Sequence, residues 1–112
     1  MLFYKKIAAG LFFAASACAA NATGEMVATC SPYGPYGSVI QGWGIIQVQP
    51  DNSCGFSNPR RYIWQNLNGV SYGATAGVCS LYNLPNWWPI KYISSSGTCN
   101  GGTQYIIEYR GT

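Results

Sequence analysis

Short runs that mix apolar and polar residues occupy most of the chain and predict a mainly β protein. The clearest run is 104–109, where Tyr and two Ile residues lie among Gln and Glu. The runs at 39–41, 45–49 and 90–93 are rich in β-branched and aromatic side chains, which favour strands. We expect a small antiparallel sandwich or an open barrel, with 90–93 and 104–109 paired as a hairpin.

Residues 58–67 fit either a helix or a strand. Asn58 and Pro59 are suited to cap and begin a helix, and Ile63 and Leu67 would share one of its faces. The aromatic and β-branched residues in the middle of the segment are equally good strand formers. The segment is short, so a strand is the preferred interpretation.

Glycine, asparagine and proline mark the places where strands should end. Residues 50–53 indicate a turn, and the Asn-Gly pair at 68–69 predicts a tight turn followed by a strand at 70–72. Two glycines flank Trp43, which suggests a bend or bulge that leaves this indole exposed.

Residues 1–22 have the layout of a secretory signal peptide. Two lysines precede an apolar run at 7–15, and small residues follow it. The apolar run is shorter than the stretch of about 20 residues that a membrane-spanning helix needs. Cleavage is expected after Ala22 or, with a shorter signal, after Ala19. The remaining residues, 23–112, are predicted to form a single domain.

Cys18 offers a different end to the signal. Residues 15–18 resemble the lipobox of bacterial lipoproteins, in which the cysteine becomes the lipidated first residue, although Ala15 stands where leucine is usual. Lipid on Cys18 would tether the protein to a membrane surface. Without it, the protein is expected to be secreted, or to reside in the periplasm or cell envelope.

Four cysteines follow the signal, and they predict a disulfide framework. An even number of cysteines in a short exported chain is typical of such frameworks. The chain has no histidine, and none of these cysteines forms a C-x-x-C pair, so neither a metal site nor a cofactor is expected. The four residues are Cys30, Cys54, Cys79 and Cys99.

The sequence after the signal repeats itself faintly. Cys-Ser-x-Tyr occurs at 30–33 and again at 79–82. Each copy is followed by a Trp-bearing stretch, a second cysteine and an aromatic-aliphatic run. Two similar halves, each with its own disulfide, would explain this pattern, and chance similarity is the alternative. The first interpretation favours the pairs Cys30–Cys54 and Cys79–Cys99.

Charge and composition exclude several classes of function. After the signal, four basic residues stand against three acidic ones, so no basic surface for nucleic acid is expected. Without histidine, Ser-His-Asp and Cys-His catalysis are excluded. Asp51 and Glu108 are the carboxylates that a small secreted hydrolase of the two-carboxylate type would use, and this enzyme is an alternative function.

Aromatic side chains give the favoured hypothesis, a non-catalytic binding module for a protein or a glycan. Tyr and Trp combine a large contact area with a polar tip, which suits them to interfaces. In a strand, adjacent tryptophans face opposite sides, so one of Trp87 and Trp88 should be exposed. A purely structural, self-associating envelope protein is a further alternative, and Arg60 and Arg61 are weaker contact candidates. The predicted contact residues are Trp87, Trp88, Trp43, Tyr33 and Tyr36.

Overall fold

The computed structural model describes residues 24–111, so the predicted signal and Cys18 lie outside the described residues. The described chain is built almost entirely from strands, which confirms the mainly β prediction. The strands are β1 (Met26–Thr29), β2 (Trp43–Pro50), β3 (Arg60–Asn66), β4 (Thr75–Val78), β5 (Trp87–Ile93) and β6 (Gln104–Tyr109), with a short 3₁₀ helix η2 (Asn52–Cys54) after β2.

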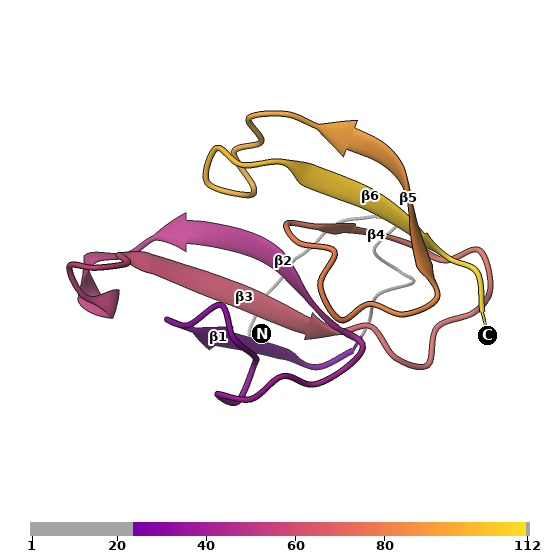
Figure 1. Ribbon diagram of the computed structural model, residues 1–112, viewed down its shortest axis with the longest axis horizontal. Helices are drawn as coiled ribbons and strands as arrows, with labels where there is room; N and C mark the ends of the chain where they lie inside the picture. Colours follow the sequence, from indigo (N-terminus) through magenta and orange to yellow (C-terminus); the bar gives the residue numbers. More distant parts are fainter. Residues whose placement is uncertain (1–23, 112) are drawn as a thin grey trace, which may run out of the picture.

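The strands form two antiparallel sheets of three strands each (Figure 1). One sheet has the order β1-β3-β2 and the other has the order β4-β6-β5. Neither sheet closes on itself, and β2 lies on the side of the first sheet that faces the second (Figure 1). In each sheet, the last strand in sequence lies in the centre, between the first two.

The two sheets are copies of one pattern, which confirms the prediction of two similar halves. We call residues 24–67 the first half and residues 74–111 the second half. Each half carries a β-bulge at the equivalent place, between Ile45 and Gln47 in β2 and between Pro89 and Lys91 in β5. The strand pairing on both sides of the bulge is also the same, so chance similarity does not account for the repeat.

Backbone hydrogen bonds outside the sheets repeat as well. Leu67 N–H donates to Gly42 C=O at 2.8 Å, and the equivalent Arg110 N–H donates to Asn86 C=O at 2.8 Å. These bonds join the residue after each central strand to the residue before each bulged strand. The two halves therefore share their connections as well as their strands.

The loop after the first cysteine also repeats, with asparagine in place of glycine. Gly34 and Gly42 have φ of 144° and 87°, and the equivalent Asn83 and Asn86 have φ of 59° and 70°. Glycine adopts positive φ freely, and asparagine tolerates it better than other residues do. The sequence echo is faint here because two different residue types satisfy one backbone requirement.

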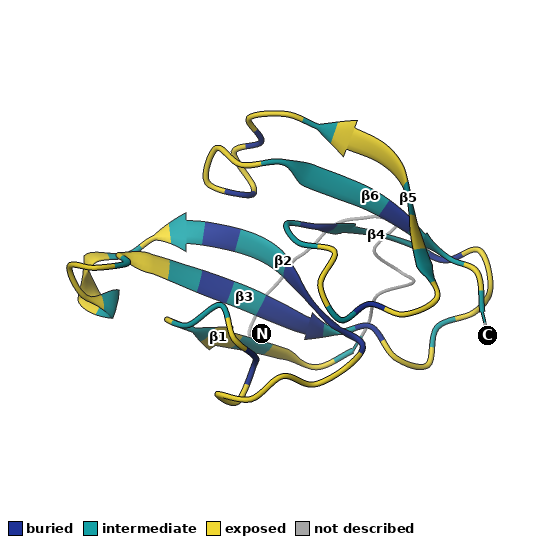
Figure 2. Ribbon diagram, in the orientation of Figure 1, coloured by how far each residue is buried: buried dark blue, intermediate teal, exposed yellow. Residues whose placement is uncertain are grey.

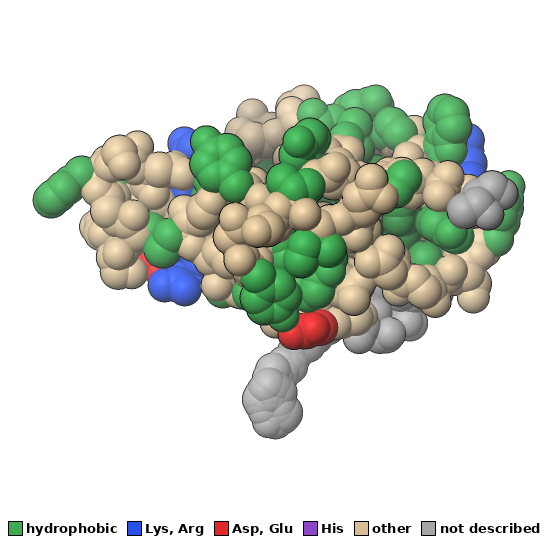
Figure 3. All heavy atoms as spheres, turned by 60° about the horizontal axis from the view of Figure 1, so that its bottom comes forward, with side chains coloured by type: hydrophobic (Ala, Val, Ile, Leu, Met, Phe, Trp, Pro, Cys, Tyr) green, Lys and Arg blue, Asp and Glu red, His purple; other side chains and the backbone are tan. Residues whose placement is uncertain are grey.

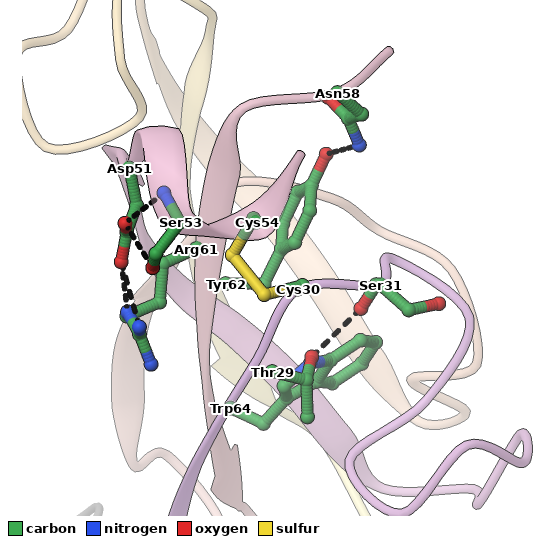
Figure 4. The surroundings of a disulfide bond; sticks show 10 residues. All are labelled: Thr29, Cys30, Ser31, Asp51, Ser53, Cys54, Asn58, Arg61, Tyr62 and Trp64. Carbon is green, nitrogen blue, oxygen red and sulfur yellow. Dashed lines mark hydrogen bonds and ion pairs between the residues drawn. A yellow bond between two sulfur atoms is a disulfide. The ribbon is translucent and has the colours of Figure 1, made fainter. Parts of the chain in front are cut away.

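Both predicted disulfides are present. Cys30 pairs with Cys54 at a Cα–Cα distance of 5.2 Å, and Cys79 pairs with Cys99 at 5.5 Å. Each bridge links the end of a first strand to the turn after the bulged strand. Figure 4 shows the first bridge beside the Tyr62 ring and close to the strand end at Thr29.

Each half contributes to its own core cluster. The first cluster holds Trp43, Ile45, Val48, Tyr62 and Trp64, with Val27 and Cys79 packed against it. The second holds Leu67, Val78, Leu84 and Ile107, with Ile46, Ala76, Trp87 and Tyr105 packed against it. Leu67 of the first half belongs to the second cluster, and Cys79 and Ile46 each pack against the cluster of the other half, so the two halves interlock.

The outer edge of β2 joins the halves. Cys79 N–H donates to Ile45 C=O at 2.7 Å, and Val48 N–H donates to Thr98 C=O at 2.9 Å. On the same strand, a Cβ at Gly44 would lie 3.0 Å from Cγ1 of Val78. This contact is tighter than ordinary packing, so the close approach of the second half favours glycine there.

Some predicted elements are confirmed and others are wrong. The hairpin of β5 and β6, the strand within 58–67 and the turns at 50–53 and 68–69 are present. Residues 39–41 and 70–72 are not strands, and β1 and β4 were not predicted. Both missed strands are short edge strands with small residues, so their apolar pattern is weak.

Candidate functional site

A shallow groove lies between the loops of the two halves, above the first core cluster. One wall comes from the loop after Cys30 and the other from the equivalent loop after Cys79. Its cavity volume of about 20 Å³ is close to that of one or two waters, so a ligand would lie along it rather than inside it. The lining residues are Pro32, Tyr33, Gly34, Val39, Ile40, Trp43, Ile45, Trp64, Ser80, Tyr82 and Asn83.

Two equivalent tyrosines stand on opposite walls of this groove. Tyr33 is 72% exposed and Tyr82 is 69% exposed. The N–H of each donates to a serine hydroxyl two residues earlier, Ser31 or Ser80, at 3.2 Å. The same local turn therefore holds both tyrosine backbones, and the repeat places two accessible phenol rings at one site.

The floor of the groove is rigid and aromatic. Trp43 and Trp64 are buried in the first core cluster. Trp64 Nε1–H donates to Thr29 Oγ1 at 2.9 Å, which fixes its indole ring (Figure 4). Tyr36 packs edge-to-face on Trp43, with ring centroids 5.7 Å apart. These contacts give the floor one defined shape before any ligand arrives.

The lip of the groove belongs to the first half alone. The loop from Cys30 to Trp43 is longer than the loop from Cys79 to Trp87, and the added residues include Val39 and Ile40. Both are exposed, and both line the groove. The shorter loop of the second half lacks this extension, and the groove lies at the joint of the two halves.

Among residues 24–111, no charged side chain lines the groove. Its polar groups come from Ser80, Asn83 and the tyrosine hydroxyls. Outside the lining, the Tyr36 hydroxyl donates to the Glu25 carboxylate, and this hydrogen bond raises the pKa of Tyr36. Figure 3 shows a face of the molecule with hydrophobic and uncharged polar side chains and only scattered charges. The groove therefore suits a ligand without net charge.

The predicted contact residues lie in separate places. Tyr33 is in the groove, Tyr36 is exposed beside it, and Trp43 forms its floor. The expectation that Trp43 is exposed was wrong: it is only 5% exposed, because its ring packs in the first cluster. Trp87 packs against the second cluster while Trp88 is 54% exposed, as adjacent strand positions predict, and neither lines the groove.

Sequence reasoning missed several residues of the groove. Tyr82 is the counterpart of Tyr33 in the repeat, so the Cys-Ser-x-Tyr echo already contained the signal for it. Val39 and Ile40 were assigned to a strand, although two apolar residues in a glycine-rich loop also fit an exposed lip. The sequence around Trp64 did not indicate a role in a groove, since a tryptophan in a strand usually packs in the hydrophobic core.

The two carboxylates of the alternative hydrolase come from different halves of the domain. Asp51 follows β2 and pairs with Arg61, whose Nη2 lies 2.6 Å from Oδ2. Hydrogen bonds from Ser53, and then from Arg61, lower the pKa of Asp51 to about 2. Glu108 lies in β6 and pairs with Arg110 at 3.1 Å. Each carboxylate has its own local partner, in a different sheet.

Comparison of the chain with protein families, with characterised proteins and with solved structures finds no match. Within residues 24–111, no group of three or more potential metal-binding side chains is found. The same part of the chain contains no helix that is long and apolar enough to span a membrane. The groove is therefore the candidate binding site of this chain.

Proposed function

We propose that this chain is an exported, non-catalytic binding domain whose groove holds a neutral glycan. The observation that carries the proposal is the pair of equivalent, exposed tyrosines on opposite walls of one uncharged groove. The two disulfides, together with the predicted signal peptide, support a location outside the cytoplasm or in the cell envelope.

The chemistry of the groove supports a sugar ligand. The faces of a sugar ring carry C–H groups that pack against aromatic rings, and its rim carries hydroxyls that need hydrogen-bond partners. Tyr33 and Tyr82 supply the rings, while Asn83 and Ser80 supply polar groups beside them. The pre-formed floor limits the entropy lost on binding.

A protein ligand is less well supported by the same observations. Protein-binding hot spots are enriched in Arg as well as Trp and Tyr, and they cluster in deep, fully desolvated pockets. This groove is shallow, and no charged side chain lines it. A neutral glycan is therefore the proposed ligand.

The test is binding of the disulfide-bonded protein to an immobilised panel of neutral and anionic oligosaccharides, followed by calorimetry with the best neutral compound. The double variant Tyr33→Ala/Tyr82→Ala should weaken binding by about tenfold or more, since each stacking contact contributes on the order of 1 kcal/mol. The matched control Tyr72→Ala removes an equally exposed tyrosine outside the groove and should bind normally.

Two results would overturn the proposal. One is a panel in which no neutral glycan is bound. The other is a bound glycan whose affinity is unchanged in Tyr33→Ala/Tyr82→Ala but lost in Trp88→Ala, because that result would move the binding surface to β5.

A further inference from the structure

The outer edge of β5 is the counterpart of the edge of β2 at which the halves join. The carbonyl of Ile45 and the N–H of Val48 bind the second half. Their equivalents on β5 are the carbonyl of Pro89 and the N–H of Tyr92. Within residues 24–111, the Pro89 carbonyl accepts no backbone hydrogen bond from outside the sheet, and the Tyr92 N–H donates none to a group outside it.

The burial of side chains differs between the two strands in the same way. Val48 in β2 is 9% exposed, whereas the equivalent Tyr92 is 61% exposed. Ile46 packs against the second core cluster, whereas the equivalent Ile90 is exposed. Figure 2 shows this contrast, with β2 mostly buried or intermediate and β5 mostly exposed.

The first half carries the counterpart of the surface that binds the edge of β2. This surface, at the Cys30–Cys54 disulfide, is not covered by other described residues. In the second half, Cys79 and the turn at Thr98 contact β2, and Cys99 is buried. In the first half, the equivalent Cys30 is exposed. Among the described residues, neither Cys30 N–H nor the carbonyl of Ser53, which is equivalent to Thr98, has a hydrogen-bond partner.

Three residues of the second half obstruct this contact. Trp88 occupies the position of Gly44, where a Cβ would already be crowded by Cγ1 of Val78 at 3.0 Å. Arg110 occupies the position of the buried Leu67, and its guanidinium lies 5.7 Å from the centre of a Trp88 ring. Lys91 stands on the edge strand in place of Gln47, and charge on an edge strand discourages pairing.

We propose that the chain carries a head-to-tail interface for a second copy of itself. The side chains of Trp88, Arg110 and Lys91 block this interface in the wild-type protein. The bare disulfide corner of one copy matches the bare edge of β5 in another, as the second half matches β2 within one chain. Such contacts are heterologous and can continue without closing into a dimer. The obstruction therefore makes the second half a capping repeat, which ends the array.

Reversal of the obstruction tests the proposal. The disulfide-bonded wild-type protein should remain monomeric in sedimentation velocity over a wide range of concentration. In the opened variant Trp88→Gly/Lys91→Gln/Arg110→Leu, which restores the first-half residue at all three obstructing positions, the average mass should rise with concentration and pass that of a dimer. The same variant with Trp88→Ala in place of Trp88→Gly should associate more weakly, and it serves if glycine at 88 weakens the strand.

Two further variants locate the contact. Ile90→Lys added to the opened variant should weaken association by about tenfold or more, because a desolvated charge would lie at the edge. Tyr72→Gly alone removes an exposed aromatic elsewhere and should leave the protein monomeric.

Each contrary result has a definite meaning. If the wild-type protein associates as readily as the opened variant, the claim that these side chains block association is wrong. An opened variant that folds but stays monomeric would overturn the interface, and one that stops at two copies would overturn the head-to-tail arrangement. Glycan binding in the groove does not enter this test, so the two proposals can fail independently.

Discussion

The two halves of this domain have the same backbone arrangement but make different contacts with the rest of the chain. Strand order, bulge position and the bonds around each central strand are the same in both. What differs is the outer edge of the bulged strand, which is covered at β2 and bare at β5. The comparison teaches that backbone requirements maintain the repeat, while side chains at a few positions decide what each copy contacts.

The largest effect is expected from the central buried residue of each half. Trp64 and Ile107 occupy equivalent positions in β3 and β6, each in its own core cluster. Truncation to alanine should lower the free energy of unfolding by about 3–5 kcal/mol for Trp64 and about 2–5 kcal/mol for Ile107. Urea unfolding followed by fluorescence and by circular dichroism measures both.

The interlocked cores also predict that each variant unfolds in one step. The two optical signals should coincide along the denaturant axis, as they do for a two-state domain. Separate transitions for the two signals would mean that the halves are independent units, contrary to the packing of Cys79 and Ile46 across the joint.

The two disulfides should contribute unequally. Replacement of both cysteines of one bridge by alanine should cost about 2–5 kcal/mol. The Cys79–Cys99 pair should lie at the upper end of this range, because Cys99 is buried and Cys79 packs against the first core cluster. The Cys30–Cys54 pair should lie at the lower end, because Cys30 is exposed. Thermal unfolding of the two double variants tests the order, and an equal loss would contradict the asymmetry.

A smaller difference is expected between Gly44 and its counterpart Trp88. Gly44→Ala places a methyl group 3.0 Å from Cγ1 of Val78, and such overpacking should cost about 1–3 kcal/mol. Trp88→Ala changes an exposed side chain and should alter stability by less than about 0.5 kcal/mol. Chemical unfolding of both variants measures the difference. A neutral Gly44→Ala would show that the joint is loosely packed.

The smallest expected effect is on stability at acidic pH. Hydrogen bonds from Ser53 and Arg61 lower the pKa of Asp51 from its ordinary value of 3.8 to about 2. Because the folded pKa is the lower one, this carboxylate stabilises the fold above the ordinary value, and its contribution disappears as pH falls from 3.8 towards 2. The equivalent residue of the second half is Ser96, which does not ionise.

Thermal unfolding across the acid range checks this asymmetry. Asp51→Asn should remove the part of the acid dependence that Asp51 contributes, so its melting temperature should fall less than that of the wild-type protein between neutral pH and pH 2. An identical decline in both proteins would show that the ion pair with Arg61 contributes no stability of its own.

Much of the fold could be predicted from the sequence because its signals are local. The β-branched runs mark β2, β5 and β6, and the echo of Cys-Ser-x-Tyr indicated both the halves and the disulfide pairs. The failures at 39–41 and 70–72 have one cause. Apolar residues there suggested strands, but glycines with positive φ at 37, 42, 69 and 73 break the extended backbone on each side.

The candidate site was harder to predict because it depends on how the halves meet. Nothing near Trp43 indicates that the indole is buried, since its burial comes from distant core residues and the loop above it. The partnership of Tyr33 with Tyr82 needs both the repeat and the joint. That one of Trp87 and Trp88 is exposed could be predicted because adjacent strand positions alternate, which is a local rule, but the pattern did not say which one.

Both disulfides of the described residues close within one half, so neither of them crosses the joint. A pulling force applied to the two halves would therefore part them at β2 before either half could unravel. A ligand bound by both Tyr33 and Tyr82 would brace that seam and raise its resistance to force. The joint would resist separation most strongly when the groove is occupied.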